Sequence, residues 1–178
     1  FRIPVEEFYD LLEFAAIATV GDVMDLQGEN RIIVKEGLKK IPKTQNTGLM
    51  ALIRANGLEG GKITAYHIGF VLGPCINASG RLDTAARSLA LFDEEDPDRA
   101  AKIAGDLASL NESRKALTEK GKEEAIRQVE ETSVGADRVL VIYLPECHES
   151  LAGIIAGRIR EKYYKPVIVL TKGEHGVK

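Results

Sequence analysis

The segment from Asp96 to Glu131 constrains the fold of this sequence more than any other feature. Asp96 is a favoured N-cap residue, Pro97 is a favoured first residue of a helix, and no further proline follows before Glu131. Apolar residues recur through the segment at three- and four-residue spacing, which predicts one helix of about 35 residues and about 50 Å. Gly105 and Gly121 are the positions at which such a helix could bend or break.

A helix of this length that is charged on most of its faces typically connects two domains. Residues 93–132 carry a net charge of −5, whereas the whole chain carries −3. A coiled-coil dimer is the competing interpretation, and the irregular heptad pattern disfavours it. We therefore expect two differently built parts on either side of a linker helix.

The first part, residues 1–92, is predicted to be almost wholly helical, because no strand-like alternation stands out in it. A first helix is expected from Pro4 to Val20, with a buried face made of Val5, Phe8, Leu11, Leu12, Ala15 and Ala16. Further helices are expected over residues 30–40, after a cap at Asn46 or Thr47, after a cap at Thr64, and over residues 82–92.

The last part, residues 133–178, has a different pattern. Residues 138–144 (RVLVIYL) and 166–170 (PVIVL) are continuous apolar runs, which predict two fully buried strands. A helix is expected between them, from Glu149 to Tyr163. Strand, helix and strand in this order predict a right-handed βαβ unit with parallel strands.

The segment from Tyr66 to Leu82 (YHIGFVLGPCINASGRL) holds the densest set of candidate binding residues. It begins as an apolar helix, and we expect the helix to break at Gly73 and Pro74 and to continue as an irregular loop. The loop would hold the side chains of Asn77, Ser79 and Arg81 within five residues, and it would present backbone N–H groups and the charged guanidinium fork to an anion. An ordinary helix-to-helix connection with a surface arginine is the alternative.

Asp22 is the candidate metal ligand, because apolar residues flank it on both sides. A carboxylate in such a setting is costly unless it is paired, hydrogen-bonded or bound to a metal, and oxygen ligands suit Mn²⁺ or Mg²⁺. A turn or N-cap aspartate with access to solvent is the alternative.

Composition excludes several classes of protein. A chain of 178 residues suffices for one ordinary domain or two small ones, and no apolar run approaches the ~20 residues of a membrane span. Two cysteines make no disulfide framework, which suits the reducing cytoplasm. The net negative charge disfavours a general nucleic-acid binder, although local basic patches remain available.

Because the chain begins at Phe1 without a methionine, we expect an excised fragment.

Four segments of the sequence carry a family resemblance: residues 18–31, 69–82, 110–114 (LNESR) and 148–170, which begins HESLAG. In this order they resemble the RecJ family of single-strand-specific 5′→3′ DNA exonucleases, which belongs to the DHH phosphoesterase superfamily. The segments lie at plausible spacing and together span nearly the whole chain.

The resemblance implies an α/β fold in three parts. Residues 1–92 would be the C-terminal part of a DHH phosphoesterase domain, mainly helical, and 93–132 the interdomain linker helix. Residues 133–178 would be the N-terminal part of a DHHA1 domain, with the βαβ unit. The implied activity is metal-dependent hydrolysis of phosphodiester bonds in single-stranded DNA, in repair and recombination, with Mn²⁺ or Mg²⁺ as cofactor. The implied setting is a cytoplasmic monomer without membrane contact, working with a single-strand DNA-binding protein and a helicase.

The resemblance also assigns roles to residues, position by position. Asp22 matches the aspartate of the family's GTVADV segment, which implies a catalytic role in metal binding. Asn77, Gly80 and Arg81 match the DNA-binding GPRINAAGRL signature, and His148 and Arg158 match the family's histidine and arginine in the later run. Arg158 would serve equally well as a structural ion-pair partner, and His148 as a helix cap or a surface residue.

Departures from the family pattern limit these assignments. Cys75 stands where the family usually has arginine, and a thiol cannot pair with a phosphate. Cys147, Glu149 and Ser150 replace the tryptophan, proline and glycine of the family's WHPG motif, and Glu149 disfavours tight phosphate binding there.

The other metal ligands of the family lie in an N-terminal DxD segment and a DHH motif. The sequence has no DHH, and its single DxD string, at Asp96 to Asp98, is not N-terminal. We therefore expect an interior fragment that has no nuclease activity by itself. Two alternatives stay open: a DHH/DHHA1 phosphoesterase that acts on oligonucleotides or cyclic dinucleotides, and a catalytically inactive nucleic-acid-binding scaffold.

Overall fold

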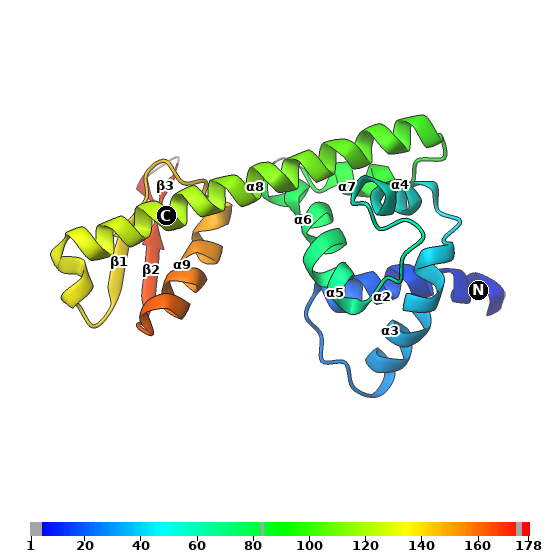
Figure 1. Ribbon diagram of the computed structural model, residues 1–178, viewed down its shortest axis with the longest axis horizontal. Coiled ribbons are helices and arrows are strands. Elements are labelled where there is room, and N and C mark those ends of the chain that lie inside the picture. Colours follow the sequence, from blue (N-terminus) through cyan, green and yellow to red (C-terminus); the bar gives the residue numbers. More distant parts are fainter. Residues whose placement is uncertain (1–4, 83, 174–175) are drawn as a thin grey trace. The chain divides into compact units, whose positions relative to one another are not determined.

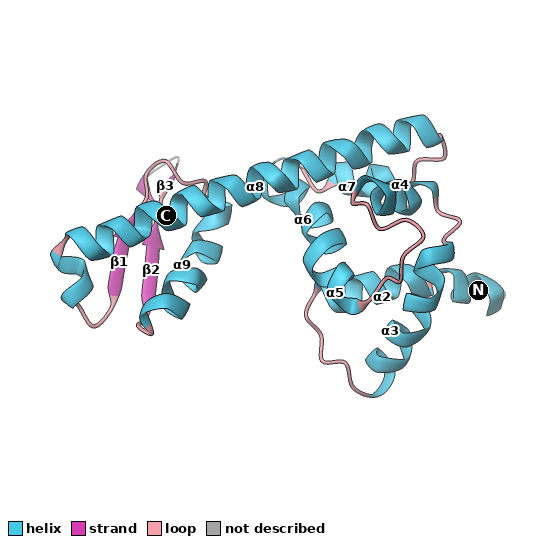
Figure 2. Ribbon diagram, in the orientation of Figure 1, coloured by secondary structure: helices cyan, strands magenta, loops and turns pink. Residues whose placement is uncertain are grey.

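The computed structural model describes residues 5–82, 84–173 and 176–178, with side chains described from residue 8 onward (Figure 1). The chain divides into two compact units, Phe1–Asn111 and Glu112–Lys178. Helices dominate the first unit, and the strands are confined to the second (Figure 2). No described helix is long and apolar enough to cross a membrane.

The first unit contains helices only among its described residues, as the sequence predicts. Its core gathers large aliphatic side chains from most of the helices, among them Leu49, Leu52, Ile68, Leu72 and Leu91. Its elements are α1 (Val5–Asp10), α2 (Leu12–Gly21), α3 (Gly28–Lys40), the 3₁₀ turn η1 (Ile41–Lys43), α4 (Thr47–Ala55), α5 (Ala65–His67), the π-helix η2 (Ile68–Leu72), α6 (Gly73–Leu82), α7 (Ala86–Phe92) and the first part of α8 (Pro97–Glu131).

The predicted helix starts are confirmed where a polar side chain caps them. The Asn46 side chain accepts a hydrogen bond from the backbone N–H of Leu49 at 2.8 Å and so caps α4. Thr64 and His67 form a reciprocal capping box at the start of α5. The Asp96 carboxylate accepts a hydrogen bond from the backbone N–H of Asp98 at 2.8 Å, and α8 starts at Pro97. These caps are local, so they can be inferred from sequence alone.

The single helix predicted from Pro4 to Val20 is interrupted. α1 ends at Asp10 and α2 begins at Leu12, and Leu11 lies at the junction. Phe8 and Leu11 are exposed, so the buried face predicted for them is wrong, whereas Ala16 is fully buried. Pro4 and the side chain of Val5 lie outside the described part of the chain.

The irregular loop predicted after Gly73 is also wrong, because Gly73–Leu82 forms helix α6. Proline inside a helix lacks an N–H and its ring meets the carbonyl of the preceding turn. Here the preceding turn is the π-helix η2, which is wider than an α-helix, and Pro74 follows it as the second residue of α6. Gly73 adopts ordinary helical angles (φ −57°, ψ −46°), so the run continues without a break.

Helix α8 is continuous from Pro97 to Glu131, and neither Gly105 nor Gly121 interrupts it. Gly121 has a packing role in the second unit. A Cβ atom at this position would lie 2.5 Å from Cδ1 of Ile155 in helix α9 (Glu149–Tyr163). The glycine therefore lets the two helices approach closely.

The second unit contains the predicted βαβ arrangement. β1 (Leu140–Tyr143) pairs in parallel with β2 (Val167–Leu170), in the register Leu140 to Val167, and α9 connects them. Short strands β3 (Lys172–Gly173) and β4 (Gly176–Val177) pair antiparallel, and the 3₁₀ turn η3 (Ser133–Ala136) follows α8. β1 is not buried on both faces: Leu140 and Ile142 are buried, but Val141 and Tyr143 are exposed. The apolar run predicted a fully buried strand because both of its faces are apolar, and only one face is covered.

Candidate functional site

A surface pocket of about 530 Å³ in the first unit brings together two of the predicted site residues, Asp22 and Asn77. The C-terminal end of α2, the following loop, the start of α3 and one side of α6 form its walls. Its lining is Ile17, Ala18, Thr19, Gly21, Asp22, Met24, Asn30, Gly73, Ile76 and Asn77. Segments 50 residues apart in the sequence thus meet at one site.

Asp22 is held by the way in which α2 ends. The backbone N–H of Val23 donates to the carbonyl of Val20, and that of Met24 donates to the carbonyl of Thr19, each at 3.1 Å. These two bonds form a Schellman motif, which requires a left-handed residue that is usually glycine. Here the left-handed residue is Val23, at φ 56°. The motif fixes the direction in which the chain leaves Asp22, at the expense of backbone strain in a β-branched residue.

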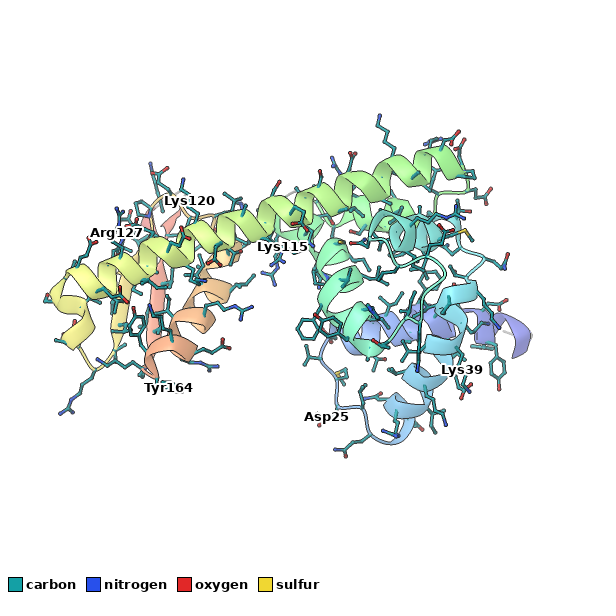
Figure 3. All side chains as sticks on the ribbon, viewed as in Figure 1. Asp25, Lys39, Lys115, Lys120, Arg127 and Tyr164 are labelled. Atoms are coloured by element: carbon teal, nitrogen blue, oxygen red, sulfur yellow. The ribbon has the colours of Figure 1, made fainter. Side chains whose placement is uncertain are left out.

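Two polar side chains of the pocket, those of Asp22 and Asn77, are exposed and available to a ligand. Among the described residues, neither the carboxylate of Asp22 nor the amide of Asn77 makes a hydrogen bond or ion pair. Asn30 is partly committed, because its amide nitrogen donates to the carbonyl of Asp25 at 3.0 Å. Asp25 lies in the loop between α2 and α3 (Figure 3). The pocket thus offers one carboxylate and one uncommitted amide.

The residues of α6 divide between surface and core. Asn77, Gly80 and Arg81 are exposed. Cys75 is fully buried, and its thiol donates to the side-chain oxygen of Asn56 at 3.4 Å. Two residues along an α-helix correspond to about 200°, so Cys75 points away from the side that carries Asn77. The thiol of Cys75 therefore lies in the core of the first unit and not on the surface that carries Asn77.

Ser79, the hydroxyl that the sequence places in the same segment, is also turned inward. Its hydroxyl donates to the carbonyl of Ile76 at 3.1 Å and lies 2.7 Å from the hydroxyl of Ser88. Ser88 in turn donates to the same carbonyl at 2.7 Å. This buried network ties α6 to α7 and is structural.

The two predicted site residues of the second unit lie on α9. His148 is its N-cap: the Nδ1 atom accepts a hydrogen bond from the backbone N–H of Ser150 at 3.3 Å and lies 2.7 Å from the Ser150 hydroxyl. Arg158 is exposed and forms an ion pair with Glu161 at 3.6 Å. Both residues therefore have a structural role that does not involve a ligand.

A second pocket, of about 700 Å³, lies within the second unit, between α8 and the turn that joins β1 to α9. Leu117, Leu144 and Leu151 give it apolar walls, and Cys147 and His148 line its edge. Burial raises the pKa of the Cys147 thiol, so the group stays protonated near neutral pH. Its charged lining is mixed, with Lys120 and Arg127 beside Glu123, Glu124 and Glu146.

Sequence reasoning missed two prominent surface residues. Tyr66 and Phe70 were assigned to an apolar helix, yet both are exposed, and their rings stack at 4.9 Å between centroids. Their i, i+4 spacing was visible in the sequence and is the signal that could have indicated a shared helix face.

Comparison with known proteins identifies close relatives, although no family model matches. The RecJ single-stranded-DNA-specific exonuclease of Escherichia coli is 33% identical over 179 residues, covering 98% of this chain and 31% of the relative. The crystal structure of Thermus thermophilus RecJ in complex with Mg²⁺ superposes with a TM-score of 0.81 at 34% identity, covering 93% of this chain and 26% of that protein. A structure of exonuclease RecJ bound to manganese gives a TM-score of 0.78, with 91% and 41% covered. The chain thus spans about a third or less of the curated relatives' length.

Proposed function

Because this chain is homologous over nearly its whole length to one segment of the RecJ exonucleases, we propose that it is the corresponding segment of a metal-dependent exonuclease that hydrolyses single-stranded DNA. The observation that supports this most directly is the meeting of Asp22 and Asn77 in one pocket, because the two residues come from separate motifs of the family resemblance. The proposal includes a role in DNA repair and recombination.

The domain assignment forms part of this proposal. Residues 1–92 would belong to a DHH domain, residues 93–132 would be the linker helix, and residues 133–178 would belong to a DHHA1 domain. The wholly helical character of the described residues before α8 and the parallel βαβ unit after it support this assignment.

The residues present do not fit a complete divalent-metal site. Among the described residues, no group of three or more histidine, cysteine, aspartate or glutamate side chains is arranged so that it could hold a metal ion. Two-metal hydrolysis requires ions about 4 Å apart, held by several such ligands. Asp22 can supply one ligand to a Mn²⁺ or Mg²⁺ ion, and the remaining ligands would come from other parts of the protein. We derive no hydrolytic step from this chain's residues.

The residues of this chain would instead position the strand. Asn77 and Arg81 on α6 are spaced one helical turn apart, and both are exposed, so an amide and a guanidinium can face consecutive parts of a phosphate backbone. Gly80, beside Arg81, leaves room for a close approach. His148 and Arg158 are proposed as contacts from the second unit, in addition to their structural roles.

Measurement of binding and cleavage by the 178-residue chain tests this proposal. We expect salt-dependent binding of a fluorescent oligothymidylate and no degradation of it in the presence of Mn²⁺. Arg81→Ala should weaken binding and reduce the slope of log K against log salt by about 1. Lys39→Ala removes an exposed cation from α3 in the same unit (Figure 3) and serves as the matched control. Metal-dependent degradation, or equal effects of the two variants, would contradict the assignment.

A catalytically inactive binding segment is the second candidate function. The departures from the family pattern at Cys75 and at the WHPG positions, where Cys147, Glu149 and Ser150 stand, favour it. Its test is the parent protein: ssDNA degradation with Mn²⁺ that is lost in the Asp22→Asn variant supports the exonuclease, whereas binding without degradation supports the scaffold. Cleavage of short oligonucleotides or cyclic dinucleotides in preference to long strands would instead favour the other phosphoesterases of the superfamily. We also propose that the parent is a cytoplasmic monomer and that its partners are a single-strand DNA-binding protein and a helicase. Co-purification with the parent protein tests for these two partners.

A further inference from the structure

Helices α5, η2 and α6 follow one another without a break, from Ala65 to Leu82 (Figure 1). Five residues recur along this run at spacings of four, three, four and four positions. In an α-helix such spacing places residues along one side. Here Gly73 is buried, and the other four residues are exposed. We call this row the α5–α6 stripe; it consists of Tyr66, Phe70, Gly73, Asn77 and Arg81.

The two aromatic side chains of the α5–α6 stripe are unusually exposed to solvent for residues of this type. Tyr66 is 64% exposed and Phe70 is 68% exposed, although both rings could have been buried in a helical unit of this size. Their planes are inclined by only 27° at a centroid distance of 4.9 Å, which is a stacked arrangement. Large exposed rings that already stack on each other present a flat apolar surface to a third ring.

The middle of the stripe is continuous with the pocket that holds Asp22. Gly73 and Asn77 both line that pocket. Along the chain, the stripe therefore runs from the stacked rings, through two residues of the pocket, to Arg81. The π-helix η2 lies in this run, and π-helical turns frequently occur at functional sites.

We propose that Tyr66 and Phe70 form a stacking platform for the bases of a single strand whose phosphates are held by Asn77 and Arg81. This inference deepens the proposed function and depends on it. Proteins that hold single strands without regard to sequence combine aromatic side chains for the bases with cationic groups for the backbone. The stripe has both kinds of group in line. A protein segment covering the two rings is the rival occupant, and it would give no reason for an amide and a guanidinium in the same row.

The test compares two oligonucleotides of about 12 residues, within the usual site size for single-strand binding. One is oligothymidylate, and the other carries abasic sites, so it keeps the phosphates and lacks the rings. Binding of each to the 178-residue chain is measured by fluorescence anisotropy. Tyr9→Ala removes another exposed tyrosine of the first unit and is the matched control.

We expect Tyr66→Ala and Phe70→Ala each to weaken oligothymidylate binding by about 5- to 150-fold, the range found for loss of one base–aromatic stack. Neither variant should change binding of the abasic strand. Phe70→Trp should retain affinity because it keeps an aromatic face, whereas Phe70→Leu, which keeps apolar bulk only, should lose it.

Several outcomes would contradict the stacking platform, and they show whether the proposed function is wrong as well. If Asn77→Ala and Arg81→Ala weaken binding but the aromatic variants do not, the platform is wrong and the proposed function stands. If the unsubstituted chain binds no single strand, both are wrong. Equal losses on thymidine and abasic strands would show a structural role for the rings. In the DNA-free parent, protection of Tyr66 from acetylation by N-acetylimidazole, with Tyr9 still reactive, would show that a protein segment covers the platform.

Discussion

Replacement of Gly48 by alanine tests the packing that supports the candidate site. Gly48 lies in α4, where a Cβ atom would come within 1.8 Å of the carbonyl oxygen of Leu91 and 2.6 Å of its carbonyl carbon in α7. Cβ atoms essentially never approach other heavy atoms closer than 3.0 Å. Because the obstruction is backbone, α4 and α7 would have to separate by more than an ångström.

The expected cost follows from two opposing effects. Alanine is favoured over glycine inside a helix by about 1 kcal/mol, whereas overpacking typically costs about 1–3 kcal/mol, and a clash with backbone belongs at the upper end of that range. We therefore expect Gly48→Ala to lower the free energy of unfolding by about 2 kcal/mol, which for a unit of this size lowers Tm by roughly 8–16 °C. The same separation would loosen the Ser79–Ser88 contact that holds α6.

The matched control is Gly105→Ala, in the first unit and in the middle of a helix. A Cβ atom there has no neighbour within 4 Å. Only the gain in helix propensity remains, so this variant should be more stable by about 0.5–1 kcal/mol. Differential scanning calorimetry of both variants measures the two shifts. Equal or increased stability of Gly48→Ala would refute the close approach of α4 to α7.

Three further predictions concern single residues of the first unit. Cys75→Arg restores the family's usual residue and buries an unpaired charge, so it should lower the free energy of unfolding of the first unit by several kcal/mol, as measured by urea titration. A soluble variant of unchanged stability would show that the side chain at position 75 reaches the surface. Val23→Gly should raise stability by about 1 kcal/mol because it relieves the left-handed strain at φ 56°, and a lower Tm would contradict this. Burial raises the pKa of the Glu13 carboxyl above its ordinary value of 4.5, an effect that the 2.7 Å hydrogen bond from Thr44 only partly offsets. The folded state then binds this proton more tightly than the unfolded state, so the contribution of Glu13 to stability should fall as the pH rises from 4.5 through the raised pKa. The free energy of unfolding of the Glu13→Gln variant should decrease less over this pH window, and parallel stability curves for the two proteins would contradict the prediction.

Features with local causes could be predicted from the sequence. Asn46 and Asp96 start helices because their side chains satisfy backbone N–H groups within three residues, and those partners are visible in the sequence. The βαβ unit was predictable for a similar reason, since its strands and helix have different apolar periodicities. Contacts between distant elements were not predictable. The sequence alone could not show that α2 and α6 would place Asp22 beside Asn77 in one pocket.

The helical conformation of residues 73–82 changes how the signature in α6 should be interpreted. In an irregular loop, every polar side chain could have faced a ligand. On a helix, successive residues turn by about 100°, so the signature separates into two faces. Cys75 and Ser79 face the core, whereas Asn77 and Arg81 face outward with Phe70. The inward residues explain why α6 is held rigidly against α7 and α4, and the outward residues are those that can contact a strand. A motif match at an inward position therefore supports the fold, and only the outward positions support the function.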